Sequence, residues 1–107
     1  MLTVEYNPIE GRTLPDKKVK SCVENVIKLG MTHFCVGSSL FIDEFRCHVK
    51  RGNINANDII FKFIDEDEVE HNIRCDFRGN LEHWPKGFCE YDMEVFSELA
   101  FGIPRSN

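Results

Sequence analysis

The side chains best suited to nucleophilic or metal chemistry in this 107-residue chain are five cysteines and four histidines. A cysteine thiolate activated by a nearby histidine is the arrangement that thiol hydrolases use. Cys35 or Cys89 would serve as the nucleophile. The histidines available as the base are His33, His48 and His83. Because a chain with so many residues of both types offers such pairings by chance, the sequence predicts no catalytic residue among them.

The same residue types also bind zinc. The candidate ligands are Cys47, His48, His71, Cys75 and Cys89. The spacing of His71 and Cys75 would suit one face of a helix, but their segment alternates as a strand, where they would lie about 13 Å apart. No Cys-x-x-Cys pair occurs in the sequence. We therefore expect no metal ion and no other cofactor, and we interpret the cysteines as small apolar groups.

Motifs that bind nucleotides or acyl substrates are absent from the sequence, which has neither a glycine-rich phosphate loop nor a Gly-x-Ser-x-Gly turn. The acidic residues 65–68 lack the spaced ligands of a calcium loop, so they are interpreted as a solvated turn. The net charge of −5 opposes general attraction to nucleic acid or to an anionic membrane. Since we find no bilayer-spanning apolar run and no export signal, we expect a cytoplasmic protein with reduced thiols.

The spacing of apolar residues predicts the elements that must position these side chains. Strands are expected at residues 2–6, 32–37, 59–64 and 69–77, and helices at residues 16–29, 40–51 and 92–102. This order predicts an α/β fold with a small, partly parallel sheet that ends in an antiparallel hairpin. A chain of this length is expected to form a single domain over residues 1–107.

The first two helices are predicted from apolar residues that recur at intervals of three and four. We expect Asp16 to cap the start of the first helix and Gly30 to follow its end. For the second helix, Ser38 or Ser39 is the expected cap and Gly52 the stop signal. The side chains expected to face the core are Val19, Cys22, Val23, Val26, Ile27, Phe41, Ile42, Phe45 and Val49.

The last two predicted strands have different patterns. Residues 59–64, IIFKFI, are nearly all apolar, which is typical of a strand covered on both faces. Residues 69–77 alternate strictly, which predicts a half-buried strand antiparallel to the one before it. The side chains expected on its buried face are Val69, His71, Ile73, Cys75 and Phe77.

The run GNLEHWPKGFCE, residues 79–90, holds the one tryptophan of the chain. Pro85 fixes the backbone and Gly87 permits a tight turn, under which Trp84 and Phe88 can pack. We therefore interpret the run as a structural clasp that closes the last hairpin onto the sheet. A second interpretation stays open, in which Trp84 and Phe88 are exposed and form a partner-facing patch.

The same run resembles the C-terminal signature of ABC-type ATPases in the group that includes overcoming-lysogenization-defect nucleases, retron-associated ATPases and other phage-defence ATPases. The residues that fit this signature are Gly79, Trp84, Pro85, Gly87, Phe88 and Glu90. Cys89 replaces the usual aromatic residue. Upstream, the stretch SSLFIDEFRCHVKRGNINANDIIFKFID follows the helix, turn and strand that come after the switch of this family. Asn7, Pro8 and Pro15 match the loop that follows its Walker B strand.

The residues that carry the chemistry of the family are replaced in this chain. Ser38 stands where the resemblance places the histidine that senses the γ-phosphate, and Gly37 stands where a threonine precedes it. Ile9 occupies the position of an acidic residue, although Glu10 is adjacent. The resemblance therefore implies a free-standing, degenerate C-terminal half of such an ATPase, without the Walker A loop of the N-terminal lobe.

The resemblance implies a non-catalytic protein-interaction module, acting as a subunit, regulator or decoy of a partner ATPase of the phage-defence or DNA-repair type. Self-association is the other kind of partnership that it leaves open. Two alternatives stand beside this hypothesis. The chain could be an enzyme, either an ATPase half-site completed by a partner or a thiol hydrolase. It could also be a folded gene remnant without a specific role.

Overall fold

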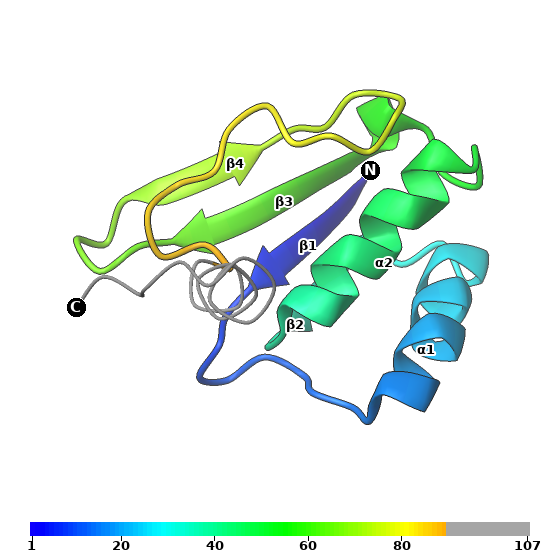
Figure 1. Ribbon diagram of the computed structural model, residues 1–107, viewed down its shortest axis with the longest axis horizontal. Helices are drawn as coiled ribbons and strands as arrows, with labels where there is room; N and C mark the ends of the chain where they lie inside the picture. Colours follow the sequence, from blue (N-terminus) through cyan, green and yellow to red (C-terminus); the bar gives the residue numbers. More distant parts are fainter. Residues whose placement is uncertain (90–107) are drawn as a thin grey trace, which may run out of the picture.

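The computed structural model describes residues 1–89, which form a four-stranded sheet with two helices on one side (Figure 1). The elements are β1 (Leu2–Tyr6), α1 (Asp16–Lys28), β2 (His33–Val36), α2 (Ser39–Lys50), a 3-10 turn (Ala56–Asp58), β3 (Ile59–Ile64) and β4 (Glu70–Ile73). The predicted α/β class is confirmed. The predicted helix at residues 92–102 lies outside the described residues. Within residues 1–89, neither helix is long and apolar enough to cross a membrane.

The strands lie in the order β2-β1-β3-β4. β1 pairs in parallel with both β2 and β3, while β3 and β4 form an antiparallel hairpin. The prediction of a partly parallel sheet that ends in a hairpin is therefore confirmed. The chain passes from β1 to β2 through α1 and then crosses back past β1 to β3 through α2. The direction in which strands are added therefore reverses at β1.

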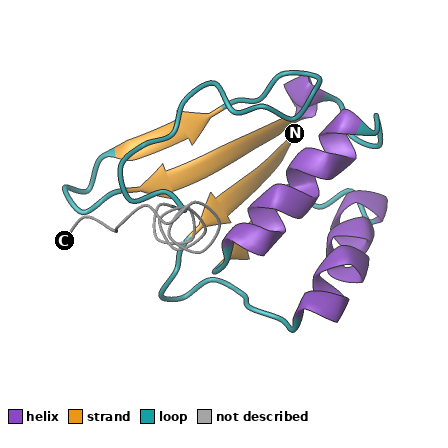
Figure 2. Ribbon diagram, viewed as in Figure 1, coloured by secondary structure: helices purple, strands orange, loops and turns teal. Residues whose placement is uncertain are grey.

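One hydrophobic core lies between the sheet and the helices. The ring of Phe34 in β2 lies 5.8 Å from that of Phe41 and 6.3 Å from that of Phe45, so α2 packs directly on the sheet. Helix α1 packs beside α2 (Figure 2). Most helix positions expected in the core are buried, whereas Cys22 and Ile27 are only partly buried. The buried helix residues are Val19, Val23, Val26, Phe41, Ile42, Phe45 and Val49.

The helix ends follow the predictions except at the caps. Gly30 and Gly52 follow the two helices with φ of +65° and +80°, as expected of residues that end a helix. The prediction that Asp16 caps α1 was wrong, because Pro15 occupies the cap position and Asp16 is already helical. The carboxylate of Asp16 still lies in the first turn, where the helix dipole favours a negative charge. Ser38 takes the cap position of α2 with an extended backbone, but its side chain makes no cap hydrogen bond.

The fourth strand is shorter than the alternation predicted. β4 ends at Ile73, and beyond it a single bridge joins Cys75 to Leu81. Val69 and Phe77, which were expected inside, are 52% and 72% exposed. The side chain of Asp76 accepts hydrogen bonds from the N–H groups of two following residues, so the chain turns where the pattern predicted a strand.

Candidate functional site

The tryptophan run divides into a buried part and an exposed part. Phe88 is only 1% exposed, and its ring centroid lies 5.2 Å from that of Tyr6 and 5.5 Å from that of Phe63. Pro85 is also buried, and its C=O accepts a hydrogen bond from the N–H of Phe88. Trp84, by contrast, is 41% exposed. The clasp interpretation therefore describes Phe88 and Pro85, while Trp84 belongs to the surface.

Arg46 of α2 contacts both Trp84 and the turn at Gly79. The guanidinium of Arg46 lies 5.2 Å from the centre of the Trp84 ring, and Arg46 Nε donates to the C=O of Gly79 at 2.7 Å. A cation over an aromatic face is attracted by the ring quadrupole. Gly87 has the positive φ, +87°, that its place in the run suggested, and Lys86 is exposed. The exposed ring of Trp84 therefore has two neighbours, the guanidinium of Arg46 and the ring of Phe88 at 5.8 Å between centroids.

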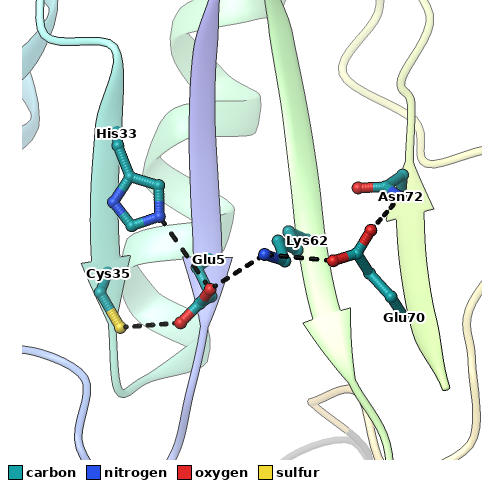
Figure 3. Close-up of polar contacts among 6 residues, drawn as sticks. All are labelled: Glu5, His33, Cys35, Lys62, Glu70 and Asn72. Carbon is teal, nitrogen blue, oxygen red and sulfur yellow. Dashed lines mark hydrogen bonds and ion pairs between the residues drawn. The ribbon is translucent and has the colours of Figure 1, made fainter. Parts of the chain in front are cut away.

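The second face of the sheet, opposite α2, carries a row of polar side chains (Figure 3). We call this the polar row, and it consists of Glu5, His33, Cys35, Lys62, Glu70 and Asn72. Lys62 is its centre, because Lys62 Nζ lies 3.6 Å from Glu5 Oε1 and 3.1 Å from Glu70 Oε1. The row lies on this face because side chains alternate along a strand, and the neighbours of Glu5 and Lys62 fill the core on the other face.

The contact between Lys62 and Glu70 in the polar row stabilises the charged form of both side chains. The hydrogen bond from Asn72 and the nearby ammonium of Lys62 lower the pKa of Glu70. Hydrogen bonding to Glu70 is the main cause that raises the pKa of Lys62. Because the pairs are partly exposed, solvent screens them, and such pairs contribute little to stability. The row therefore gives the second face a fixed pattern of charge rather than a large share of the folding free energy.

The geometry around Cys35 opposes a nucleophilic role. Cys35 Sγ lies 3.6 Å from Glu5 Oε2, and burial together with the negative charge of Glu5 raises the pKa of the thiol. The thiolate is the reactive form of cysteine, so this environment disfavours it. His33 Nε2 lies 4.0 Å from Glu5 Oε1, so the imidazole and the thiol contact the same carboxylate. Cys89, the other candidate nucleophile, is buried.

The remaining histidines have separate local partners. His48 is buried, with Nδ1 at 2.9 Å from Asn53 Nδ2 and Nε2 at 3.6 Å from Glu44 Oε1. His83 Nδ1 lies 3.7 Å from Glu82 Oε1 on the surface. Within the described part of the chain, no three His, Cys, Asp or Glu side chains come close enough together to hold a metal ion. None of the five cysteines, all of which lie within residues 1–89, forms a disulfide, and Cys47 is exposed.

The residues at the switch position of the resembled family have a packing role. A Cβ atom on Gly37 would lie 2.6 Å from the C=O oxygen of Gly11, and one on Gly11 would lie 2.2 Å from the C=O oxygen of Val36. The two glycines thus let the loop after β1 lie directly against the end of β2. Ser38 and Ser39, which follow, are half-buried at the start of α2. This close approach gives a physical reason for the absence of a larger residue at Gly37.

A shallow hollow of about 500 Å³ lies at the carboxyl ends of β1 and β3. This is the point where the winding of the sheet reverses, and open α/β sheets commonly bind ligands there. Its charged lining residues are Glu5, Asp65, Glu66 and Lys86. Asn7 also lines it, but its Oδ1 already accepts hydrogen bonds from the N–H groups of Ile9 and Glu10. With three carboxylates against one lysine, the lining repels rather than attracts a phosphate group.

Hydrogen bonds in the β3–β4 turn stabilise the charged form of Asp65. His71 Nε2 lies 2.8 Å from Asp65 Oδ2, and the N–H groups of Asp67 and Val69 donate to Asp65 Oδ1. These contacts lower the pKa of Asp65, and the hydrogen bond to His71 has the largest effect. The four acids of this turn thus include one with a structural role.

We expect Asp65→Asn to lower the free energy of unfolding at neutral pH and to have a smaller effect in acid. A carboxyl group whose pKa is lowered by folding stabilises the fold above its unfolded value, about 3.9 for Asp, and this contribution is lost as the pH falls through the folded value. Urea denaturation of both proteins at about pH 7 and about pH 3 measures the difference. A difference that does not change with pH would contradict this role for the charge of Asp65.

Sequence reasoning identified the tryptophan run but missed the polar row. A signal for the polar row was present in the sequence, because Glu5 and Lys62 are charged residues within the otherwise largely apolar strands β1 and β3. Among residues 1–89, the site therefore offers paired charges, an exposed aromatic ring and a sheet face that neither helix covers. A scan against protein-family models, a search of curated proteins and a search of solved structures each found no match to this chain.

Proposed function

We propose that this chain is a non-catalytic protein-interaction module and that its second sheet face is the interface. The observation that carries this proposal is the parallel arrangement of β2, β1 and β3 with helices on one face only within residues 1–89 (Figures 2 and 3). Parallel sheets are ordinarily covered on both faces. The uncovered face combines the polar row with apolar side chains, including Ile64, which is 49% exposed.

The proposed partner is an ABC-type ATPase of the phage-defence or DNA-repair type, to which this chain would act as a subunit, regulator or decoy in the cytoplasm. The resemblance of the tryptophan run and of the upstream stretch supports this choice. The carboxylates that line the hollow at the ends of β1 and β3 support a role without nucleotide chemistry. The raised pKa of Cys35 supports a role without thiol catalysis.

Site-specific photo-crosslinking in the native cells tests the proposed interface. A benzophenone side chain at Ile64 faces the partner, whereas the same group at Lys20, on the exposed side of α1, is the matched control. We expect crosslinks to an ATPase with a phosphate-binding loop from position 64 and not from position 20. Crosslinks between two copies of the chain would indicate self-association instead, and equal crosslinking from both positions would contradict the interface.

We also expect that the purified chain does not bind ATP. The acidic lining of the hollow and the replacement of the switch residues by Gly37 and Ser38 are the reasons. Isothermal titration calorimetry with ATP and Mg²⁺ measures this directly, with ADP as the control for binding through the adenosine. A dissociation constant in the micromolar range, about −8 kcal/mol of binding free energy, would overturn the non-catalytic assignment.

A further inference from the structure

The outer edge of β2 is partly open. β2 is the terminal strand of the sheet, and its even-numbered residues bond to β1, as the C=O groups of Thr32 and Val36 do. Its odd-numbered residues therefore direct their N–H and C=O groups outward. At one end, this edge is occupied by Arg12, which donates to the C=O of Cys35 at 3.1 Å and accepts from the N–H of Gly37 at 2.8 Å. Next to Arg12, the C=O of His33 and the N–H of Cys35 have no paired strand among residues 1–89.

A groove of about 580 Å³ runs along this open edge, between β2 and α1. We call it the edge groove. Its volume lies within the range of roughly 300–1,000 Å³ that is usual for ligand pockets. Its apolar lining, which we call the groove floor, consists of Leu14, Cys22, Val26, Leu29, Met31 and Phe34. Its charged lining residues are Arg12 and Lys18, and within the described part of the chain neither forms an ion pair and no carboxylate lines the groove.

The Arg12 bridge shows how an added strand would pair. A peptide residue opposite Phe34 would donate its N–H to the C=O of His33 and accept from the N–H of Cys35, which repeats the pattern of Arg12 opposite Val36. Its side chain would share the face of Phe34 and contact the groove floor. The peptide residue two positions after the one opposite Phe34 would lie opposite Val36, where Arg12 already pairs. The carboxylate of a peptide residue opposite Cys35 would overlap the backbone N–H of Arg12, so a parallel peptide must end at the residue opposite Phe34.

Charge selects the direction of the peptide. A parallel peptide brings its terminal carboxylate toward the guanidinium of Arg12 and the ammonium of Lys18, where the opposite charges attract. An antiparallel peptide would bring its N-terminal ammonium to the same two cations, which repel it. Strand addition at a sheet edge and capture of a terminal carboxylate are both established modes of peptide recognition.

We propose that the edge groove binds the C-terminal segment of a partner protein as a strand parallel to β2, with an apolar last residue on the groove floor and the terminal carboxylate held by Arg12 and Lys18. This inference deepens the proposed function and rests on it, since it names a partner class for one edge of the same sheet. It uses a different surface from the crosslinking test at Ile64, so the two can fail separately.

Fluorescence polarisation with the labelled peptide fluorescein-Val-Thr-Val-Thr-Val tests the proposal, once with a free carboxylate and once amidated. We expect the free acid to bind at least about tenfold more tightly, because amidation removes a charge-assisted contact. Arg12→Glu should weaken the free acid about tenfold or more and leave the amidated peptide nearly unchanged. Lys20→Glu, on the same helix as Lys18 but outside the groove, should change neither.

Backbone amide exchange separates this mode from binding elsewhere, because the N–H of Cys35 should exchange more slowly with the free-acid peptide bound. Thermal melts of both charge variants show whether the fold is kept. Equal binding of acid and amide, or binding without protection of the Cys35 amide, would overturn the proposal. So would the absence of binding up to about 1 mM both by this probe and by a pool of free-acid pentapeptides randomised over their final residues. If the peptides fail to bind but position 64 still crosslinks to an ATPase, the proposed interaction module is supported and only the role of the edge groove is rejected.

Discussion

Replacing Phe88 with alanine is expected to lower the free energy of unfolding by about 3–5 kcal/mol, the usual cost of truncating a buried aromatic residue. The Phe88 ring contacts Tyr6 from β1 and Phe63 from β3, so its loss opens a cavity under two strands at once. Domains of this size have a total stability of about 5–15 kcal/mol. The Phe88→Ala variant should therefore be partly unfolded at temperatures where the parent is fully folded.

The neighbouring residues provide the controls. Trp84→Ala should cost only about 1–2 kcal/mol, because its ring is 41% exposed and loses mainly the contacts with Arg46 and Phe88. Lys86→Ala should change stability by no more than about 0.5 kcal/mol, as is usual for exposed positions. Urea denaturation followed by circular dichroism compares all three, since it does not depend on tryptophan fluorescence. A larger loss for Trp84→Ala than for Phe88→Ala would show that Trp84 forms the clasp.

Gly79→Ala should be the second strongly destabilising change, by about 2–5 kcal/mol. Gly79 has φ of +80°, and a Cβ atom there would lie 2.4 Å from the C=O oxygen of Arg46 in α2. Because this oxygen belongs to a helix, it cannot move aside without disturbing α2. The substitution should also break the hydrogen bond from Arg46 Nε to the C=O of Gly79.

Gly52→Ala is the matched control for this effect. Gly52 has the same φ of +80°, but a Cβ atom there would meet nothing within 4 Å. Only the backbone strain remains, which costs about 1 kcal/mol. Guanidinium denaturation of both variants measures the difference, and the excess for Gly79→Ala is the part due to the close approach. Equal losses would mean that the turn can shift away from α2 at no cost.

The helices and the strand pairing could be predicted because the residues that determine them are close in sequence. Val19, Val23 and Val26 mark one helical face by their spacing alone, and a helix between strands favours parallel pairing. The end of β4 could not be predicted in this way. The alternation continues to Phe77, but the side chain of Asp76 bonds to the backbone ahead of it and turns the chain. Local hydrogen bonds of this kind override a pattern of apolar residues.

The candidate site was predicted less well than the fold, because its members meet through the order of the strands. Glu5 and Lys62 lie far apart in sequence and become neighbours only when β1 lies beside β3. The apolar run of β3 also suggested a strand covered on both faces. Lys62, however, lies on the face that carries the polar row, and Ile64, two residues further along the alternating strand, is 49% exposed. The bridge of Arg12 to β2 is likewise a contact that no local pattern indicates.

The central place of β1 has a consequence for the order in which the protein folds. Thr3 pairs with His33, 30 positions later, and Leu2 pairs with Ile59, 57 positions later, whereas the β3–β4 hairpin joins residues as close as Ile64 and Glu70. Contacts between distant residues form slowly, because a long loop must close first. The hairpin and the helices should therefore form before β1 is captured between its two neighbours. A nascent chain released before residue 59 would leave one edge of β1 unpaired, which is the kind of surface that promotes aggregation.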